Sequence, residues 1–272
     1  MATQILTIEG IAIAVRESAG TGSPIVLVHG NSSSGLTFSK LIDGPLGQRH
    51  RVIALDLPGH GESGRPADPA ATYSLPGYAN VVVGVARALA VENAVFVGWS
   101  LGGHIVLEAS PRLPRAAGFF IYGTPPLAWP PDMAAAFLPH PAMAASFAAD
   151  LTEAQMDAYV AAFFVPGVQD LPEGFRTDIR RTDGQARAGL GASIRPDGYL
   201  DEVGVVASLK QPLAIVQGAH EQLVNPAYLQ GLNAPTLWRG AVQIVADAGH
   251  APQWEQPEAF GALIEAFAAD CK

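Results

Sequence analysis

The feature that most constrains this chain is a G-x-S-x-G motif formed by Gly98, Ser100 and Gly102. A strand-like run of β-branched and aromatic residues precedes Ser100, and a helical pattern follows it. Strand, sharp turn and helix are the context in which a serine of this motif is exposed as a nucleophile. The two glycines leave space where the backbone of the turn crowds its neighbours. The motif therefore predicts a nucleophile at Ser100 and an oxyanion-binding N–H at Leu101.

Seven further segments have the pattern of strands, and several are apolar throughout, as is typical of strands buried on both faces of a parallel sheet. Helical patterns alternate with them, most clearly at 75–91, where apolar residues recur on one face, and at 257–269. The sequence thus predicts an α/β fold with a mostly parallel eight-stranded sheet and helices on both faces. Besides the strand before Ser100, the strands are expected at 4–7, 11–16, 24–28, 51–55, 117–122, 212–218 and 241–245.

The pattern changes after residue 123. From there to about 193 we find no strand-like run, but prolines and short helical pieces rich in Ala, Met and Phe. The clearest piece begins at Thr152, which forms a capping box with Gln155. We therefore expect residues 1–123 and 194–272 to form the core, and residues 124–193 to form a helical cap, or lid, inserted in it.

A serine nucleophile needs a base, and seven histidines are available. His250 is best placed, because its loop follows the last predicted strand and can lie over the serine turn. His29 and His60 also follow strands, and we expect them to brace loops. His104 lies one turn into the helix after Ser100, and we expect it to pack.

The base needs an acid that orients it. Glu221 lies three residues past Gly218, at the end of a predicted strand, and is the expected acid. Asp247 is a competitor, but three residues before His250 it is poorly placed to reach the far nitrogen of that ring. The loop after the 117–122 strand offers no carboxylate.

The second oxyanion donor should come from the small, polar loop at 29–35, and Asn31 N–H is our choice together with Leu101 N–H. The sequence contains none of the H-E-x-x-H, H-x-H-x-D-H or CxxC patterns typical of metal sites. It also lacks a G-x-G-x-x-G that opens a helix in the first βα unit. We therefore expect no metal and no nicotinamide or flavin cofactor.

Charge and composition limit the kinds of molecule that the protein is expected to bind. The formal net charge of -9 argues against nucleic acid or an anionic membrane, and leaves a small molecule as the expected partner. The single cysteine, Cys271, excludes an internal disulfide. We find no signal peptide and no run of 18 apolar residues, so we expect a cytoplasmic protein. The oligomeric state is not predicted.

These motifs together resemble the α/β-hydrolase fold family along nearly the whole chain. The resemblance rests on His29-Gly30-Asn31, the DLPGHG segment at 56–61, the serine motif, Glu221 and Gly249-His250. It implies an α/β-hydrolase fold, but not a substrate, since esterases, lactonases, C–C hydrolases and peptidases share it. The epoxide hydrolases and haloalkane dehalogenases of this family use an aspartate as the nucleophile. Ser100 stands at that position in this chain, which argues against both activities.

The segments HGNSSS at 29–34 and GWSLGGH at 98–104, with a glutamate as acid, look like the metal-independent N-acylhomoserine lactone hydrolases of this fold. The resemblance implies that Asn31 and a lid tyrosine, by position Tyr159, help hold the substrate. Trp99 either lines the pocket or supports the turn. We thus expect a serine hydrolase that opens such lactones; the alternatives are a general carboxylesterase on small esters and a non-catalytic ligand-binding protein.

Overall fold

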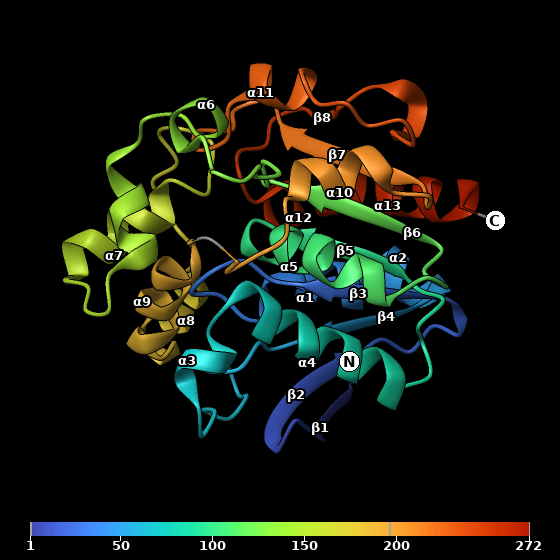
Figure 1. Ribbon diagram of the computed structural model, residues 1–272, viewed down its shortest axis with the longest axis horizontal. Helices are drawn as coiled ribbons and strands as arrows, with labels where there is room; N and C mark the ends of the chain where they lie inside the picture. The colour runs from blue at the N-terminus through green and yellow to red at the C-terminus, as the bar shows by residue number, and fades with distance from the viewer. Residues whose placement is uncertain (1, 196, 272) are drawn as a thin grey trace.

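The apolar runs of the sequence become the strands of one sheet, shown in Figure 1 for the computed structural model, which describes residues 2–195 and 197–271. The strand order is β1-β2-β4-β3-β5-β6-β7-β8. The β1–β2 and β2–β4 pairs are antiparallel and the other pairs are parallel, so the predicted mostly parallel, eight-stranded sheet is confirmed. The strands are β1 (Ala2–Ile8), β2 (Ile11–Glu17), β3 (Gly22–Val28), β4 (His50–Leu55), β5 (Val95–Trp99), β6 (Gly118–Tyr122), β7 (Leu213–Gly218) and β8 (Gln243–Val245).

The central strands are apolar throughout because successive side chains enter two different cores. In β5, Phe96 packs with the residues of α4 and α5, whereas Val97 packs with those of α1 and α13 on the other face. In β6, Phe119 and Phe120 divide in the same way. In Figure 1, α4, α5 and α10 lie on the near face of the sheet and α13 lies on the far face.

The helices that cover the sheet begin and end close to the predicted positions. The helix expected at 75–91 is α4, and it ends earlier because Ala90 has a positive φ of 53°. Outside the cap segment defined below, the helices are η1 (Gly35–Phe38), α1 (Ser39–Asp43), α2 (Pro45–Arg49), α3 (Pro69–Thr72), α4 (Leu75–Ala88), α5 (Leu101–Ala109), η2 (Ser110–Arg112), α10 (Glu202–Ser208), α11 (Pro226–Gln230), η4 (Trp238–Gly240), α12 (Pro252–Glu255) and α13 (Pro257–Asp270).

We refer to residues 124–193, between β6 and α10, as the cap segment. Its helices lie at the left of Figure 1, beside the sheet. The capping box at Thr152 is present with both of its hydrogen bonds, and it begins α7. Apolar cap residues pack into the same two cores as the sheet, Leu190 into one and Phe163 into the other. The cap helices are α6 (Met133–Ala136), η3 (Pro141–Phe147), α7 (Glu153–Ala161), α8 (Glu173–Arg181) and α9 (Gly184–Ser193).

The parallel strands end at one edge of the sheet, and the residues singled out from the sequence follow those ends. Ser100 comes directly after β5, Glu221 follows β7 and His250 follows β8. Ligands of open α/β sheets bind outside the carboxyl ends of the strands, so this edge is where a site is expected. Within residues 2–195 and 197–271, none of the helices has the length and apolar character needed to span a bilayer.

Candidate active site

Ser100 occupies a strained turn between β5 and α5. Its backbone has φ 52° and ψ −117°, a conformation that non-glycine residues rarely adopt. Three hydrogen bonds hold it there. The amide of Ser100 donates to the Tyr122 carbonyl (2.9 Å), and its own carbonyl accepts from Gly103 N (2.9 Å) and Thr124 Oγ1 (2.7 Å). Strain of this kind persists only where the surroundings over-determine it, and it clusters at functional sites.

The glycines of the motif are required by close backbone contacts, as the sequence predicted. A Cβ at Gly98 would overlap the Gly102 carbonyl, and a Cβ at Gly102 would overlap the Val28 carbonyl. The turn therefore packs directly against its own helix and against the end of β3.

His250 and Glu221 form a buried pair beside this turn. Nδ1 of His250 lies 2.8 Å from Oε2 of Glu221, and each side chain is 2% exposed. Because the carboxylate accepts, Nδ1 carries the proton and Nε2 is left as an acceptor. Nε2 is buried and takes no hydrogen bond from the part of the chain that the structure describes. Asp247, the competing acid, is exposed, so Glu221 is the carboxylate that the geometry pairs with the ring.

The His250 loop is tied to the serine turn through Trp99. The indole Nε1 donates to the His250 carbonyl (2.7 Å), and the Trp99 side chain is fully buried. The ring of Phe163 stacks on the His250 ring, with 5.7 Å between their centres. Of the two roles considered for Trp99, lining the pocket and supporting the turn, the geometry favours support. The Trp99 ring is fully buried and is not among the residues that line the inner hollow, so its contact with substrate stays a prediction.

The loop after β3 brings Asn31 to the pocket. Leu101, the other expected oxyanion donor, also lines the pocket, and as the first residue of α5 it has no partner within the helix for its N–H. The side-chain amide of Asn31 donates to the Ser146 carbonyl in the cap segment (2.7 Å). His29 braces the loop as expected: Nδ1 donates to Gly30 O (2.7 Å) and Nε2 accepts from Leu57 N (3.0 Å). Burial lowers the pKa of His29 to about 4, so the ring is neutral.

Two buried polar contacts join the same loop to the cap segment. Ser34 Oγ donates to Oδ2 of Asp178 (2.8 Å), and the Arg187 guanidinium donates to Ser32 Oγ (3.3 Å). Burial raises the pKa of Asp178 to about 6, despite the hydrogen bond from Ser34. The position of the Asn31 loop therefore depends on cap residues far along the chain.

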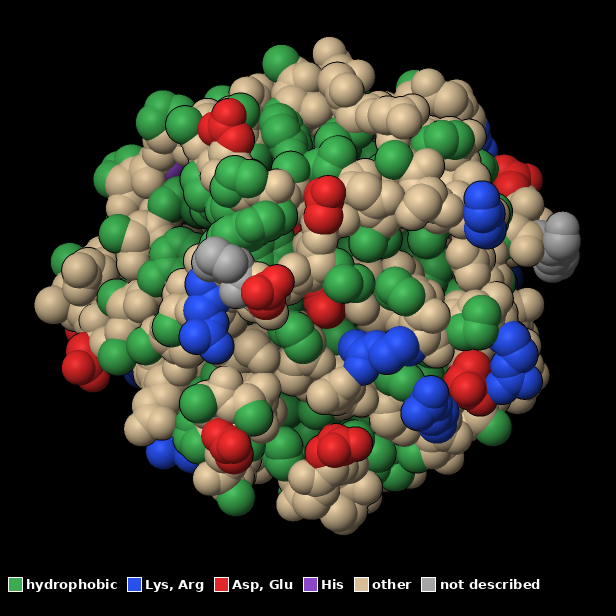
Figure 2. Space-filling view, viewed as in Figure 1, with side chains coloured by type: hydrophobic (Ala, Val, Ile, Leu, Met, Phe, Trp, Pro, Cys, Tyr) green, Lys and Arg blue, Asp and Glu red, His purple; other side chains and the backbone are tan. Residues whose placement is uncertain are grey.

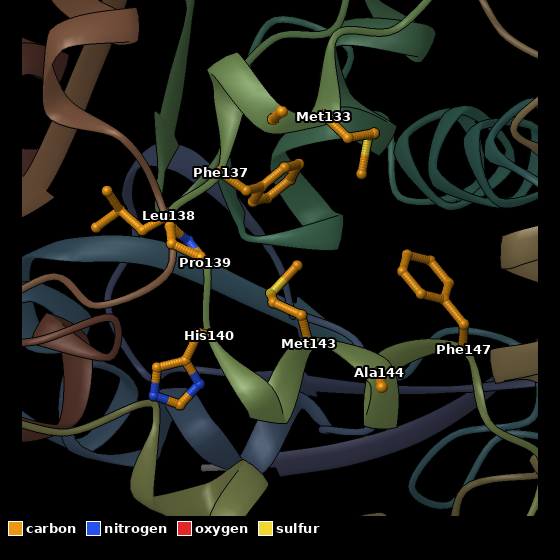
Figure 3. Close-up of a pocket in the computed structure, with 9 residues that line it drawn as sticks. Met133, Phe137, Leu138, Pro139, His140, Met143, Ala144 and Phe147 are labelled. Atoms are coloured by element: carbon orange, nitrogen blue, oxygen red, sulfur yellow. The ribbon is translucent and has the colours of Figure 1, made fainter.

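Two hollows share part of their lining: the inner one lies between the sheet edge and the cap segment, and the outer one lies within the cap segment. The inner one, of about 70 Å³, is lined by Ser100, Asn31 and Tyr159 among others. The outer one, of about 580 Å³, is apolar and open to solvent. Figure 3 shows side chains from above and below pointing into the outer hollow, and Figure 2 shows hydrophobic side chains gathered on the surface around α6. The residues shared by both hollows are Met133, Phe137, Met143 and Phe147.

Tyr159 lines the pocket, whereas other apolar residues of its helix do not. Its side chain lines the inner hollow, and its Oη accepts from Ser146 Oγ (3.1 Å). Burial raises its pKa to about 12. Met156 and Val160, on the same helix, pack into the core with Trp99. The apolar wall of the pocket comes from α6, η3 and α9, because α7 turns most of its apolar face toward the sheet.

Sequence reasoning missed two residues on the loop after β6. Gly123 has a φ of +58°, and a Cβ there would lie 2.7 Å from Cε1 of His250. Thr124 fixes the Ser100 carbonyl by the bond described above. The signal available in the sequence is a glycine followed by a threonine directly after a core strand.

His104 was expected only to pack, yet its side chain lines the inner hollow together with Ser100. Its Nδ1 lies 2.8 Å from Oε2 of Glu202, which is completely buried. No group of three or more His, Cys, Asp or Glu side chains among the described residues is arranged to hold a metal ion.

The fold and this serine turn define an α/β hydrolase. Residues 25–263 match the alpha/beta hydrolase family, and the chain belongs to it. A curated relative is the pimeloyl-[acyl-carrier protein] methyl ester esterase of Methylococcus capsulatus (strain ATCC 33009 / NCIMB 11132 / Bath), which is 31% identical over 93% of this chain and 97% of its own length. The same enzyme of Stenotrophomonas maltophilia (strain R551-3) is 29% identical over 93% and 95%.

Among solved structures, the chain is similar to the N-acyl homoserine lactonase AidH. A serine-to-glycine mutant of AidH complexed with N-hexanoyl homoserine lactone superimposes with a TM-score of 0.95 and 35% identity, over 100% of this chain and 99% of that one. The complex of AidH with N-butanoyl homoserine gives the same TM-score and identity, over 100% and 98%. A putative aryl esterase from Burkholderia cenocepacia, at 23% identity and a TM-score of 0.80, shares the fold.

Proposed function

We propose that this hydrolase opens the lactone ring of N-acylhomoserine lactones through an acyl-enzyme on Ser100. The observation that carries the proposal is the strained serine turn beside the buried Glu221–His250 pair, on a chain that superimposes over its full length on AidH bound to such a lactone. The apolar outer hollow, which shares four lining residues with the inner hollow at Ser100, supports an acylated substrate, because an acyl chain needs an apolar surface beyond the reacting ring.

The reaction begins when Ser100 Oγ attacks the ring carbonyl while Nε2 of His250 takes the hydroxyl proton. Glu221 holds the Nδ1 proton and stabilises the imidazolium. The oxyanion lies between the N–H groups of Asn31 and Leu101. The ring C–O bond then breaks, and His250 gives its proton to the leaving ring oxygen.

Deacylation uses the same base. Water attacks the acyl-enzyme, His250 takes a proton from it, and Ser100 recovers that proton as the ester bond breaks. The product is the ring-opened N-acylhomoserine, which is the substrate plus one water. Asn31 and Tyr159 hold the bound substrate in this proposal, and its acyl chain lies against the shared apolar residues of the two hollows.

The test combines mass spectrometry with the Ser100→Ala variant. Wild type should convert the lactone to N-acylhomoserine, whereas release of fatty acid and homoserine lactone would mean amide cleavage and refute the lactonase assignment. Ser100→Ala should lose at least about 10⁴-fold in kcat with an unchanged circular dichroism spectrum. Ser208→Ala, at the exposed end of α10, is the matched control and should keep full activity.

A general carboxylesterase is the second candidate, favoured by the methyl ester esterases among the curated relatives. It predicts turnover of simple esters such as p-nitrophenyl acetate at least as efficient as lactone opening. A non-catalytic ligand-binding protein predicts neither reaction. A panel of one N-acylhomoserine lactone and several simple esters separates these possibilities by their kcat/KM values.

A further inference from the structure

A second histidine–carboxylate pair, His104 with Glu202, faces the inner hollow beside Ser100. His104 lies one helical turn beyond Ser100 on α5, and residues four apart share a face of a helix. Its side chain is 11% exposed and lines the hollow, whereas Glu202 behind it is fully buried. The mechanism proposed above does not use this pair.

Glu202 fixes which nitrogen of His104 is available to a ligand. Its two carboxylate oxygens lie 3.0 and 2.8 Å from Nδ1 of His104, and Oε2 also accepts from the Leu127 amide (2.7 Å). Because both oxygens accept, Nδ1 carries a proton, which leaves Nε2 as the nitrogen that can accept a hydrogen bond. The part of the chain that the structure describes provides no hydrogen bond to Nε2.

The other groups of the hollow that are assigned to the substrate's carbonyls are donors. The N–H groups of Asn31 and Leu101 are the proposed oxyanion donors, and Tyr159 accepts from Ser146, which leaves the Tyr159 hydroxyl hydrogen free to donate. An N-acylhomoserine lactone presents two carbonyls, which accept, and one amide N–H, which donates. That N–H needs an acceptor, and His104 Nε2 is one.

We propose that His104 Nε2 accepts the amide N–H of the substrate, and that Glu202 is a positioning residue that holds the ring proton on Nδ1. This inference rests on the proposed function and assigns the group that distinguishes an N-acylated lactone from a simple lactone. A site built to pair with an N–H discriminates against an analogue that lacks it, because the buried acceptor is then left unpaired.

The test compares N-hexanoylhomoserine lactone with its keto analogue, in which CH₂ replaces the amide N–H and only the lactone can be hydrolysed. Wild type should prefer the amide by about 10-fold in kcat/KM, which corresponds to about 1.4 kcal/mol. In His104→Phe this preference should fall to about one. A preference that survives in His104→Phe, even if both rates drop, would mean that His104 only packs, and it would overturn the inference.

Glu202→Gln gives an independent readout if the phenylalanine variant does not fold. The introduced glutamine keeps one acceptor oxygen, and its NH₂ takes the place of an oxygen that lies 3.0 or 2.8 Å from Nδ1 of His104, so the proton is held less firmly on Nδ1. The amide preference should then fall, and an unchanged preference would contradict the positioning role. Glu108→Gln is the matched control: Glu108 is a buried carboxylate on the same helix that accepts from the Leu200 amide (2.8 Å), and its variant should keep the preference.

Failure of the proposed function has a different signature. If wild type hydrolyses p-nitrophenyl acetate but opens neither lactone, the lactonase assignment itself is refuted. If wild type opens both lactones equally well, the lactonase assignment survives and the role of His104 is refuted.

Discussion

Nδ1 of His250 is hydrogen-bonded to Oε2 of Glu221 at 2.8 Å, in a pair that almost no solvent reaches. A buried carboxylate in this position orients the imidazole and stabilises its charged form without taking part in bond making. The loss of His250 should therefore reduce activity more than the loss of Glu221.

Glu221→Gln should reduce kcat less than His250→Ala. We expect a loss of about 10⁴-fold or more for His250→Ala and a smaller loss, about 10²–10⁴-fold, for Glu221→Gln. Steady-state kinetics on the lactone measure both. Asp247→Asn is the control and should behave as wild type. An unchanged kcat in Glu221→Gln would mean that the acid lies elsewhere, with Asp247 as the first suspect.

Gly123→Ala should disable the site from the loop after β6. The new Cβ would lie 2.7 Å from Cε1 of His250 and push the ring away from Ser100. We expect at least about a 100-fold loss of kcat/KM, with a destabilisation of about 1–2 kcal/mol from the positive φ. Gly10→Ala is the matched control, because Gly10 also has a positive φ but open space around it. A kcat/KM loss as large in Gly10→Ala as in Gly123→Ala would count against displacement of His250.

Tyr159→Phe should affect the lactone more than a small ester. The variant removes a hydroxyl that lines the inner hollow, and one lost hydrogen bond should lower kcat/KM for the lactone by about 3- to 10-fold. p-Nitrophenyl acetate lacks the lactone ring and the N-acyl group that Tyr159 is proposed to hold, so it should be affected less. Tyr78→Phe is the control. It removes a buried hydroxyl of a residue that does not line the hollow, and it should change kcat/KM equally for both substrates. Equal losses for both substrates in Tyr159→Phe would argue for a packing role only.

Asp178→Asn should make stability less dependent on pH. Burial raises the pKa of Asp178 from 3.8 to about 6, so the folded protein binds a proton here more tightly than the unfolded chain does. Its contribution to stability is therefore fully present below pH 3.8 and is lost as the pH rises through about 6. As the pH rises from 4 to 7.5, the free energy of unfolding of the variant should therefore increase relative to that of wild type by on the order of 1–3 kcal/mol.

Denaturant unfolding of both proteins at several pH values between 4 and 7.5 measures this gain. Asn can still accept the hydrogen bond from Ser34, so the contact itself is retained. A stability difference that stays constant over the range would show that Asp178 does not titrate there.

The sequence by itself determined the sheet, the serine turn and the positions of the candidate base and acid. These follow from local patterns: apolar runs specify buried strands, and G-x-S-x-G requires a crowded turn between strand and helix. Because parallel strands end at one edge of the sheet, the residues that follow β5, β7 and β8 are expected to lie close together there. Family membership and the eight-stranded fold followed from the same residues.

Only the tertiary structure decided which side chains pair across that edge. Glu221 rather than Asp247 contacts His250, Trp99 turns behind Ser100, and His104 meets a glutamate 98 residues further along the chain. It also decided that α6, η3 and α9, more than α7, form the apolar wall of the pocket. These contacts depend on how elements that are distant in the sequence pack together. The partner of a side chain is set by the three-dimensional position of its backbone and by competition for buried space. Local periodicity in the sequence contains neither kind of information.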